Sequence, residues 1–393
     1  MLKMSVNWVI EKGKGLFFRV NRKFHIVDGY LKAGTIGFIP VNGLDKKPPD
    51  RIVIACRLTG GLGDYIIASK FIDEVRSYAP CILDAYCEKM NFGEAVLGQR
   101  ENVRILPAPG FYGRIAQYDL TMVIEHFIHV YAYSPFRLYH LAPVLYQKVR
   151  SLERVWKKLY VPVDFQCYRE ALHFKRCQLK GYDRWTEMRM GDIFQIEDKK
   201  TFIPMDSSYF SRLKELGITE QVYLTLNYGA DTMGQKNRQI KMWPLDYYNK
   251  LICLLHSTFP GLKIVQIGLK NSPDMEGADY RIKGESLETI KWILKDSILH
   301  VDCEGGLVHL ATQLDTTCLV IFGPTPLHMY GYSQNINLVS PKCSGCMGLT
   351  PDWAFQCFRG LDEPECIYDI TPEQVMGKIS QYIKDKQYDF KIY

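Results

Sequence analysis

The 393-residue chain lacks several features that would direct a protein to a membrane or to nucleic acid. No apolar run reaches the length of a membrane span, and no basic segment followed by an apolar stretch and a small-residue cleavage site forms a leader. Low-complexity tracts, internal repeats and groove-reading modules are also missing. With 47% hydrophobic and 23% charged residues, the chain has a globular composition and ample length for two domains. We therefore expect a cytoplasmic protein that does not bind nucleic acid.

Positive charge is unevenly placed along the chain. The formal net charge is +6, and the stretch from Arg137 to Arg189 holds 12 Lys/Arg against 5 Asp/Glu, interleaved with tyrosine and tryptophan. Such a stretch is suited to an anionic acceptor or to an anionic membrane surface, which would give peripheral association with the cytoplasmic membrane face. A solvated helical face is the alternative.

Twelve cysteines in a chain expected in the cytoplasm predict free thiols rather than disulfides. Most are isolated and fit small core side chains. The last four differ, because a C-x-x-C pair is followed by two more cysteines at loop spacing: Cys343, Cys346, Cys357 and Cys366. Four thiolates can complete a tetrahedral metal site that has no open position, so a bound metal would hold the loop 343–366 together. Free thiols in this loop are the alternative.

One segment of the second half has the pattern of a βαβ unit. An apolar strand (Ile298–Val301) ends in a turn with Gly305 and Gly306, and a helix (Leu307–Leu314) precedes a second apolar strand. Glycines at a strand-to-helix turn allow backbone N–H groups to face an anion such as a diphosphate. An ordinary buried βαβ turn is the alternative.

The first half contains a similar unit. The strand Arg51–Cys56 runs into a glycine turn, and a helix follows over Tyr65–Tyr78. This pattern also resembles a dinucleotide-binding fingerprint, with Asp84 where a ribose-binding acid would lie. Ile66, however, occupies the position of the third glycine.

Four motifs occur in a fixed order along the chain: Leu62-Gly63-Asp64, Lys241-x-Trp243-Pro244, Gly306-Leu307-x-His309-Leu310-Ala311 and Phe322-Gly323-Pro324-Thr325. In this order the motifs resemble glycosyltransferase family 9, the heptosyltransferase family. The four late cysteines resemble those of its autotransporter-modifying subgroup, whose members bind iron. The resemblance leaves a structural metal open between iron and zinc.

This resemblance implies an α/β protein of the GT-B fold, in which two Rossmann-like domains face a cleft. We expect an appendage with short β-hairpin structure over residues 1–50 and an acceptor domain over 51–200. A nucleotide-sugar domain over 201–393 would carry the cysteine loop and a C-terminal helix that crosses back onto the first domain.

The resemblance also implies an inverting transfer of a sugar from a nucleotide-sugar, with ADP-heptose as the leading donor. The acceptor would be a hydroxyl of a lipopolysaccharide core, another cell-surface or lipid-linked glycan, or a protein. Asp64 is the expected general base, on an acceptor-side turn with Gly61 and Gly63. Expected donor-binding residues are Lys241, Arg238, Glu304, Gly305, Gly306, Leu307 and His309.

Two features qualify this reading. The chain has no Asp-x-Asp motif of metal-dependent glycosyltransferases, so catalysis is expected to need no cofactor. Glu304-Gly305 replaces the usual Asp-[Ser/Thr] pair of the family, which leaves the donor sugar open. A GT-B nucleotide-sugar 2-epimerase and a catalytically degenerate scaffold are the alternatives.

Overall fold

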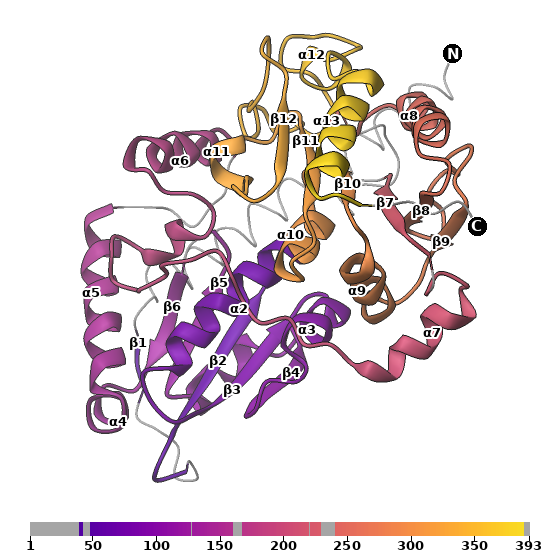
Figure 1. Cartoon of the computed structure of the whole chain (residues 1–393). Coiled ribbons are helices and arrows are strands. Elements are labelled where there is room, and N and C mark those ends of the chain that lie inside the picture. The colour runs from indigo at the N-terminus through magenta and orange to yellow at the C-terminus, as the bar shows by residue number, and fades with distance from the viewer. Residues whose placement is uncertain are drawn as a thin grey trace, which may run out of the picture.

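The computed structural model describes residues 39–41, 48–126, 128–159, 167–219, 221–228 and 240–388. Strands and helices alternate along these residues and build two six-stranded sheets, each covered by helices (Figure 1). Within the described residues, no helix combines the length and the apolar composition needed to cross a bilayer.

The first sheet has the strand order β1-β6-β5-β2-β3-β4. Its strands are β1 (Ile39–Pro40), β2 (Ile52–Leu58), β3 (Cys81–Cys87), β4 (Val103–Pro107), β5 (Leu120–Ile124) and β6 (Ile128–Tyr133). Neighbours are parallel except β5 and β6, which are antiparallel. Every residue of β5 and β6 is buried, as expected for strands covered on both faces.

The helices of the first half are α2 (Leu62–Arg76), α3 (Met90–Leu97), η1 (Tyr112–Gln117), α4 (Pro135–Leu141), α5 (Pro143–Leu159), α6 (Cys167–Lys180) and η2 (Thr186–Arg189). Helix α2 places Ile67, Phe71 and Val75 in the core at i, i+4 and i+8 spacing. It follows β2 through the glycine turn, so its first turn lies at the carboxyl edge of the sheet.

The second sheet has the order β12-β11-β10-β7-β8-β9 and is parallel throughout. Its strands are β7 (Tyr223–Asn227), β8 (Lys263–Gly268), β9 (Tyr280–Lys283), β10 (His300–Cys303), β11 (Cys318–Phe322) and β12 (Ile336–Val339). The helices are η3 (Ser207–Tyr209), α7 (Phe210–Glu215), α8 (Leu245–Thr258), α9 (Leu287–Asp296), α10 (Gly306–Gln313), α11 (Leu327–Tyr330), α12 (Glu365–Tyr368) and α13 (Pro372–Asp385).

The N-terminal appendage and the C-terminal helix were both predicted from the sequence. Most of residues 1–50, including the expected hairpin, lies outside the described residues, and Ile39–Pro40 adds a parallel strand beside β6. Helix α13 begins at the predicted N-cap Thr371, whose side chain accepts from Gln374 N. Its apolar side chains pack with α8 in the core of the second sheet, which differs from the expected crossover onto the first half. The domain limits at residues 50 and 200 stay predictions.

The two halves meet where α2 and α10 begin. A Cβ on Gly306 would lie 2.8 Å from Cβ of Leu62, and a Cβ on Gly63 would lie 2.5 Å from Cδ2 of His309. Glycine at both positions therefore allows the two helix starts to approach more closely than side chains would permit. A second contact joins α6 to α11, where His328 Nε2 lies 3.2 Å from the carbonyl oxygen of Phe174.

Candidate functional site

Asp64 lies in the first turn of α2, at the carboxyl edge of the first sheet. One carboxylate oxygen accepts a hydrogen bond from Gly61 N at 2.8 Å, and the other lies 2.9 Å from Nη2 of Arg184. The turn requires glycine at residue 60, because its φ is +92° and a Cβ there would lie 2.3 Å from Asp64 Oδ2. The backbone and one arginine thus fix the orientation of this carboxylate.

The surroundings of Asp64 keep it ionised. Burial acts to raise its pKa, but the charges of Arg184 and His126 and the hydrogen bonds from Arg184 and Gly61 outweigh burial and lower the pKa below its ordinary value. The side chain is still 33% exposed. The carboxylate is therefore ionised at neutral pH and partly open to solvent.

Arg184, which contacts Asp64, was not among the residues that the sequence predicted for the site. Its side chain is 1% exposed, and Nη1 lies 2.6 Å from Oε1 of Glu187. Nη2 also donates to the carbonyl oxygen of Glu125 at 3.2 Å, and Arg184 N donates to Met329 O in the second half. Arg184 therefore joins Asp64 and Glu187 through its guanidinium, and it contacts the second half of the chain through its backbone amide.

Glu187 continues this buried network. Oε1 lies 3.1 Å from Nδ1 of His126, and Oε2 lies 2.6 Å from Nε2 of His173. Burial acts to raise the pKa of Glu187, but Arg184 and the two histidines lower it well below the ordinary range. Glu187 is therefore the buried counter-ion of Arg184.

Three predicted donor-binding residues come together in the second half. Glu304 follows β10, and its carboxylate lies 3.8 Å from Nζ of Lys241 and 3.6 Å from Nε2 of His309. Burial acts to raise the pKa of Glu304, while Lys241, His309 and Thr325 lower it to a net value below the ordinary one. This group lies at the carboxyl edge of the sheet beside the β7–β10 neighbours, where the strand order reverses and open α/β sheets bind ligands.

His309 connects this group to the first half. Its Nδ1 lies 2.5 Å from the hydroxyl of Tyr332, and its ring edge lies against Gly63, the residue before Asp64. The ring of Tyr330 lies 6.4 Å from that of His309. Burial raises the pKa of Tyr330, and the charges of Glu304, Asp64 and Glu187 raise it further although Arg184 lowers it. The expected base and the expected donor-binding residues thus lie on the two sides of one contact.

The dinucleotide-binding alternative does not fit this geometry. Asp84 is 2% exposed, and its carboxylate binds Arg104 at 2.7 and 2.9 Å and the hydroxyl of Tyr118 at 2.8 Å. These partners occupy the carboxylate that a ribose would need. The start of α2, moreover, faces α10 rather than open space.

Three solved structures have a fold similar to that of this chain. The iron-containing dodecameric glycosyltransferase TibC from enterotoxigenic E. coli has a TM-score of 0.55 at 15% identity, with 88% of this chain and 82% of that chain covered. A glycosyl transferase family 9 structure from Veillonella parvula has a TM-score of 0.53 at 14% identity, with 85% and 97% covered. The E. coli ADP-heptose LPS heptosyltransferase II has a TM-score of 0.53 at 15% identity, with 86% and 100% covered. The chain has the GT-B fold.

This fold class is the predicted one, so that prediction is confirmed. No protein-family model and no curated protein sequence matches the chain. At these identities the GT-B structures establish the fold alone, and the roles of individual residues stay predictions.

The other predicted donor-binding residues have different outcomes. Gly305 and Gly306 form the start of α10, where Gly306 faces Leu62 across the contact between the halves. Leu307 is half-buried against the core. Arg238 lies outside the described residues. The structure therefore gathers Lys241, Glu304 and His309 and leaves Arg238 unplaced.

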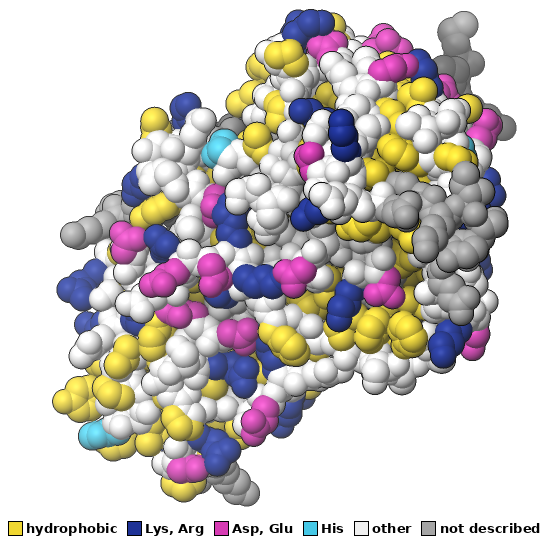
Figure 2. All heavy atoms as spheres, in the orientation of Figure 1, with side chains coloured by type: hydrophobic (Ala, Val, Ile, Leu, Met, Phe, Trp, Pro, Cys, Tyr) yellow, Lys and Arg dark blue, Asp and Glu magenta, His cyan; other side chains and the backbone are white. Residues whose placement is uncertain are grey.

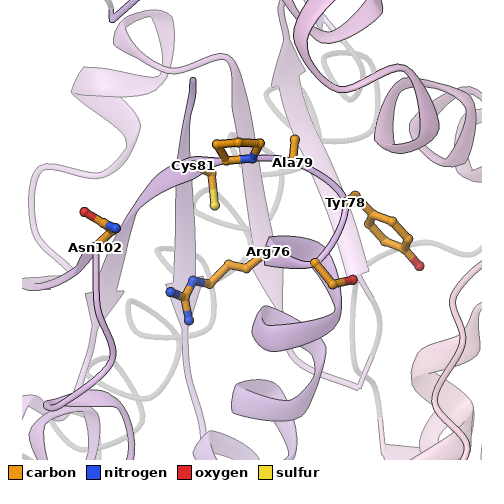
Figure 3. A pocket seen from close by; sticks show the side chains of 7 residues that line it. Arg76, Tyr78, Ala79, Cys81 and Asn102 are labelled. Atoms are coloured by element: carbon orange, nitrogen blue, oxygen red, sulfur yellow. The ribbon is translucent and has the colours of Figure 1, made fainter. Parts of the chain in front are cut away.

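A surface hollow lies on the other edge of the first GT-B sheet. It has a volume of about 430 Å³ and is lined by residues that include Arg76, Tyr78, Cys81 and Asn102 (Figure 3). These residues surround the amino end of β3, whereas Asp64 follows the carboxyl end of β2. The hollow is therefore separate from the candidate site.

The four late cysteines gather beside the second sheet. Burial raises the pKa of the Cys366 thiol to about 12, with further contributions from Cys343, Cys346 and Cys357. Among the described residues, however, no three of these sulfurs lie within 4.8 Å of one another. The four thiols thus lie in one region, but their sulfurs are farther apart than the ligand atoms of a formed metal site.

Proposed function

We propose that this chain is an inverting glycosyltransferase that moves a sugar from a nucleotide-sugar to an acceptor hydroxyl. The observation that carries this proposal is the placement of ionised Asp64 beside the Lys241–Glu304–His309 group across the α2–α10 contact. The three solved structures that share the fold are glycosyltransferases, which supports an enzyme of family 9 type.

Asp64 would act on the acceptor. Its carboxylate takes the proton of the acceptor hydroxyl while that oxygen forms a bond to the anomeric carbon of the donor sugar. The bond from that carbon to the diphosphate breaks in the same step, so the configuration at the carbon inverts. Arg184 holds the carboxylate in place and keeps it unprotonated before the acceptor arrives.

Lys241 and the start of α10 would act on the leaving diphosphate. The lysine lies 3.8 Å from Glu304, a separation too long for a direct hydrogen bond, so its ammonium is available to a diphosphate. Backbone N–H groups at a helix start add favourable charge for the same anion. Because these groups stabilise the departing charge, we propose that the transfer needs no divalent metal.

Glu304 fits a different part of the donor. A carboxylate would repel a diphosphate, but it accepts hydrogen bonds from hydroxyl groups. We therefore assign Glu304 to a hydroxyl of the donor sugar or of its ribose. ADP-heptose is the leading donor, because one of the structures with this fold is an ADP-heptose LPS heptosyltransferase. The acceptor would be a lipopolysaccharide core, another glycan or a protein.

The cysteine loop would hold a structural iron or zinc ion, as the iron-containing structure with this fold suggests. The loop is anchored beside the donor side of the fold, because Gly345 N donates to Gly323 O and Met347 N to Pro324 O. Four clustered thiols form a donor set that both ions accept. Elemental analysis of the purified chain tests this assignment, and a Cys343→Ser variant that keeps the full wild-type iron and zinc content would contradict it.

One surface fits peripheral contact with a membrane. Figure 2 shows hydrophobic side chains gathered at the corner where α4 lies, and Phe136 and Tyr139 are 72% and 60% exposed. The next helix, α5, is rich in lysine and arginine. Exposed apolar side chains beside such a basic helix are typical of proteins that bind at a membrane surface. Co-sedimentation with anionic lipid vesicles should fall in a Phe136→Ser variant, and equal co-sedimentation of both proteins would exclude this surface.

Donor binding tests the site directly. We expect calorimetry with a panel of nucleotide-sugars to find one that binds, and we expect Lys241→Ala to weaken that binding at least tenfold. Lys250→Ala is the matched control, because the Lys250 side chain on α8 is 57% exposed and pairs with Glu373 at the surface. Equal affinity of Lys241→Ala and Lys250→Ala would remove the diphosphate assignment.

A further inference from the structure

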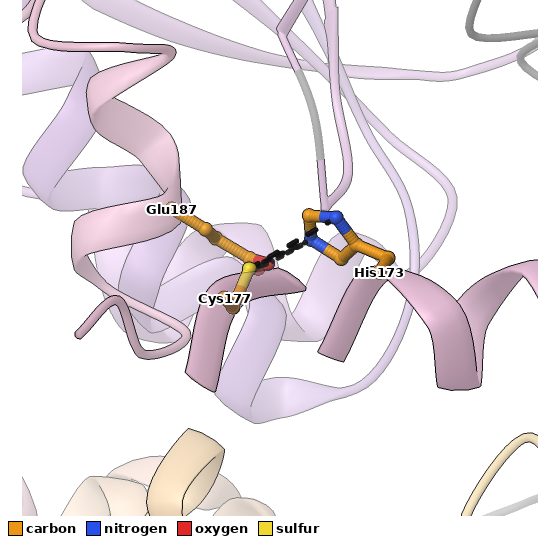
Figure 4. A group of neighbouring side chains, drawn as sticks. All are labelled: His173, Cys177 and Glu187. Atoms are coloured by element: carbon orange, nitrogen blue, oxygen red, sulfur yellow. Dashed lines mark hydrogen bonds and ion pairs between the residues drawn. The ribbon is translucent and has the colours of Figure 1, made fainter. Parts of the chain in front are cut away.

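Glu187, the partner of Arg184, is also grouped with His173 and Cys177, and all three side chains are of types that can bind a metal ion. Figure 4 shows His173 and Cys177 on α6 directed toward Glu187 on η2. Nε2 of His173 lies 2.6 Å from Oε2 of Glu187, and Sγ of Cys177 lies 3.4 Å from that nitrogen and 4.0 Å from that oxygen. All three ligand atoms lie within 4.8 Å of one another.

The geometry is close to that of a zinc site. Bonds of about 2.0–2.3 Å in a tetrahedron separate ligand atoms by about 3.3–3.7 Å. The sulfur–nitrogen separation already falls in this range, and the other two separations reach it with shifts of less than about 1 Å. His173 and Cys177 are four residues apart on one helix, which places both ligands on the same face.

The local charge balance favours a cation. Asp64 and Glu187 bring two negative charges to this region, and Arg184 brings one positive charge. Buried carboxylates are costly unless they are paired with cations. A divalent ion that binds as the thiol of Cys177 loses its proton to solvent would add one net positive charge beside Glu187.

We propose that His173, Cys177 and Glu187 bind a divalent transition-metal ion of the zinc class, distinct from the cysteine loop, with water as the fourth ligand. The site joins α6 to η2 beside the contact between the halves, where the rings of Phe174 and Tyr330 lie 6.1 Å apart. A metal on Oε2 leaves Oε1 of Glu187 to Arg184, so occupancy would fix the arginine that orients Asp64. Metal binding itself does not depend on the proposed sugar transfer.

Cobalt binding to the full-length chain tests this site. After a chelator strips the protein, Co²⁺ is titrated, and bound equivalents are counted together with the thiolate-to-cobalt charge-transfer band. We expect Cys177→Ser and His173→Gln each to bind one equivalent less than the wild type. Cys253→Ser is the matched control, because this cysteine is exposed on α8, and it should bind as many equivalents as the wild type. Cobalt on the cysteine loop is common to all four proteins and cancels in the comparison.

Equal cobalt stoichiometry in the wild type, Cys177→Ser and His173→Gln overturns the proposal. Circular dichroism confirms that each variant is folded. If Cys177→Ser does not fold, His173→Gln decides the question, because the His173 side chain is 17% exposed and tolerates a polar replacement better. Nucleotide-sugar binding measured on the same samples separates a failure of the metal site from a failure of the proposed function.

Discussion

Replacing Arg184 by methionine should destabilise the chain strongly. The substitution keeps a long, unbranched side chain and removes the charge, so the main change is electrostatic. Glu187 is 1% exposed and loses a partner at 2.6 Å, whereas Asp64 is 33% exposed and keeps its bond to Gly61 N. Most of the cost therefore comes from leaving Glu187 buried without its cation.

Removing one partner of a buried ion pair costs about 3–5 kcal/mol of unfolding free energy. Asp64 adds little, because water and the Gly61 amide still solvate it. The free energy of unfolding of Arg184→Met should thus fall by about 3–5 kcal/mol at neutral pH. Arg184→Met/Glu187→Gln should recover about half of this loss or more, because it removes the uncompensated charge.

Urea unfolding followed by circular dichroism measures these differences. Arg212→Met is the control, because this arginine pairs with Glu285 at the surface and should change stability little. The pH dependence gives a further check. The folded-state pKa of Glu187 lies below its ordinary value of 4.5, so the ion pair stabilises fully above that pH and loses its effect as the pH falls below it. An Arg184→Met variant as stable as Arg212→Met would refute the buried network.

Two further substitutions test the packing around the site. Gly63→Ala should destabilise the contact with His309 by about 1–3 kcal/mol, whereas Gly113→Ala, which has no neighbour within 4 Å, should be neutral in thermal unfolding. Trp243→Phe should cost about 1–3 kcal/mol in urea unfolding and leave donor affinity unchanged, because the buried indole donates to Ile370 O at 2.7 Å. A loss of donor affinity in Trp243→Phe would instead place this ring in the site.

The strand and helix order was largely accessible from the sequence. The apolar runs Arg51–Cys56 and Ile298–Val301 predicted β2 and β10 to within about two residues, because strands covered on both faces are almost continuously hydrophobic. The strand β6 was missed. It pairs with β5 in antiparallel fashion, and such a neighbour breaks the alternation of strand and helix on which the prediction relied.

The residues of the candidate site could be predicted only in part from the sequence. Asp64, Glu304 and His309 could be chosen because each lies in or next to a motif that resembles glycosyltransferase family 9. Arg184 could not, because it reaches Asp64 from 120 positions away in a basic stretch that was expected to face an acceptor or a membrane. Arg137 in the same stretch is also structural, since it binds Asp119 at 2.9 Å. Charge density along a sequence does not reveal which cations become buried partners.

Slow release of sugar to water by the purified chain tests the central claim most directly, because water can replace the missing acceptor. We expect the wild type to release nucleoside diphosphate and free sugar from the donor that it binds. Asp64→Asn should bind this donor equally well and release at least tenfold less. Interconversion of two nucleotide-sugars would instead identify an epimerase. Binding without any turnover by the wild type, or equal release by Asp64→Asn, would contradict transfer through Asp64.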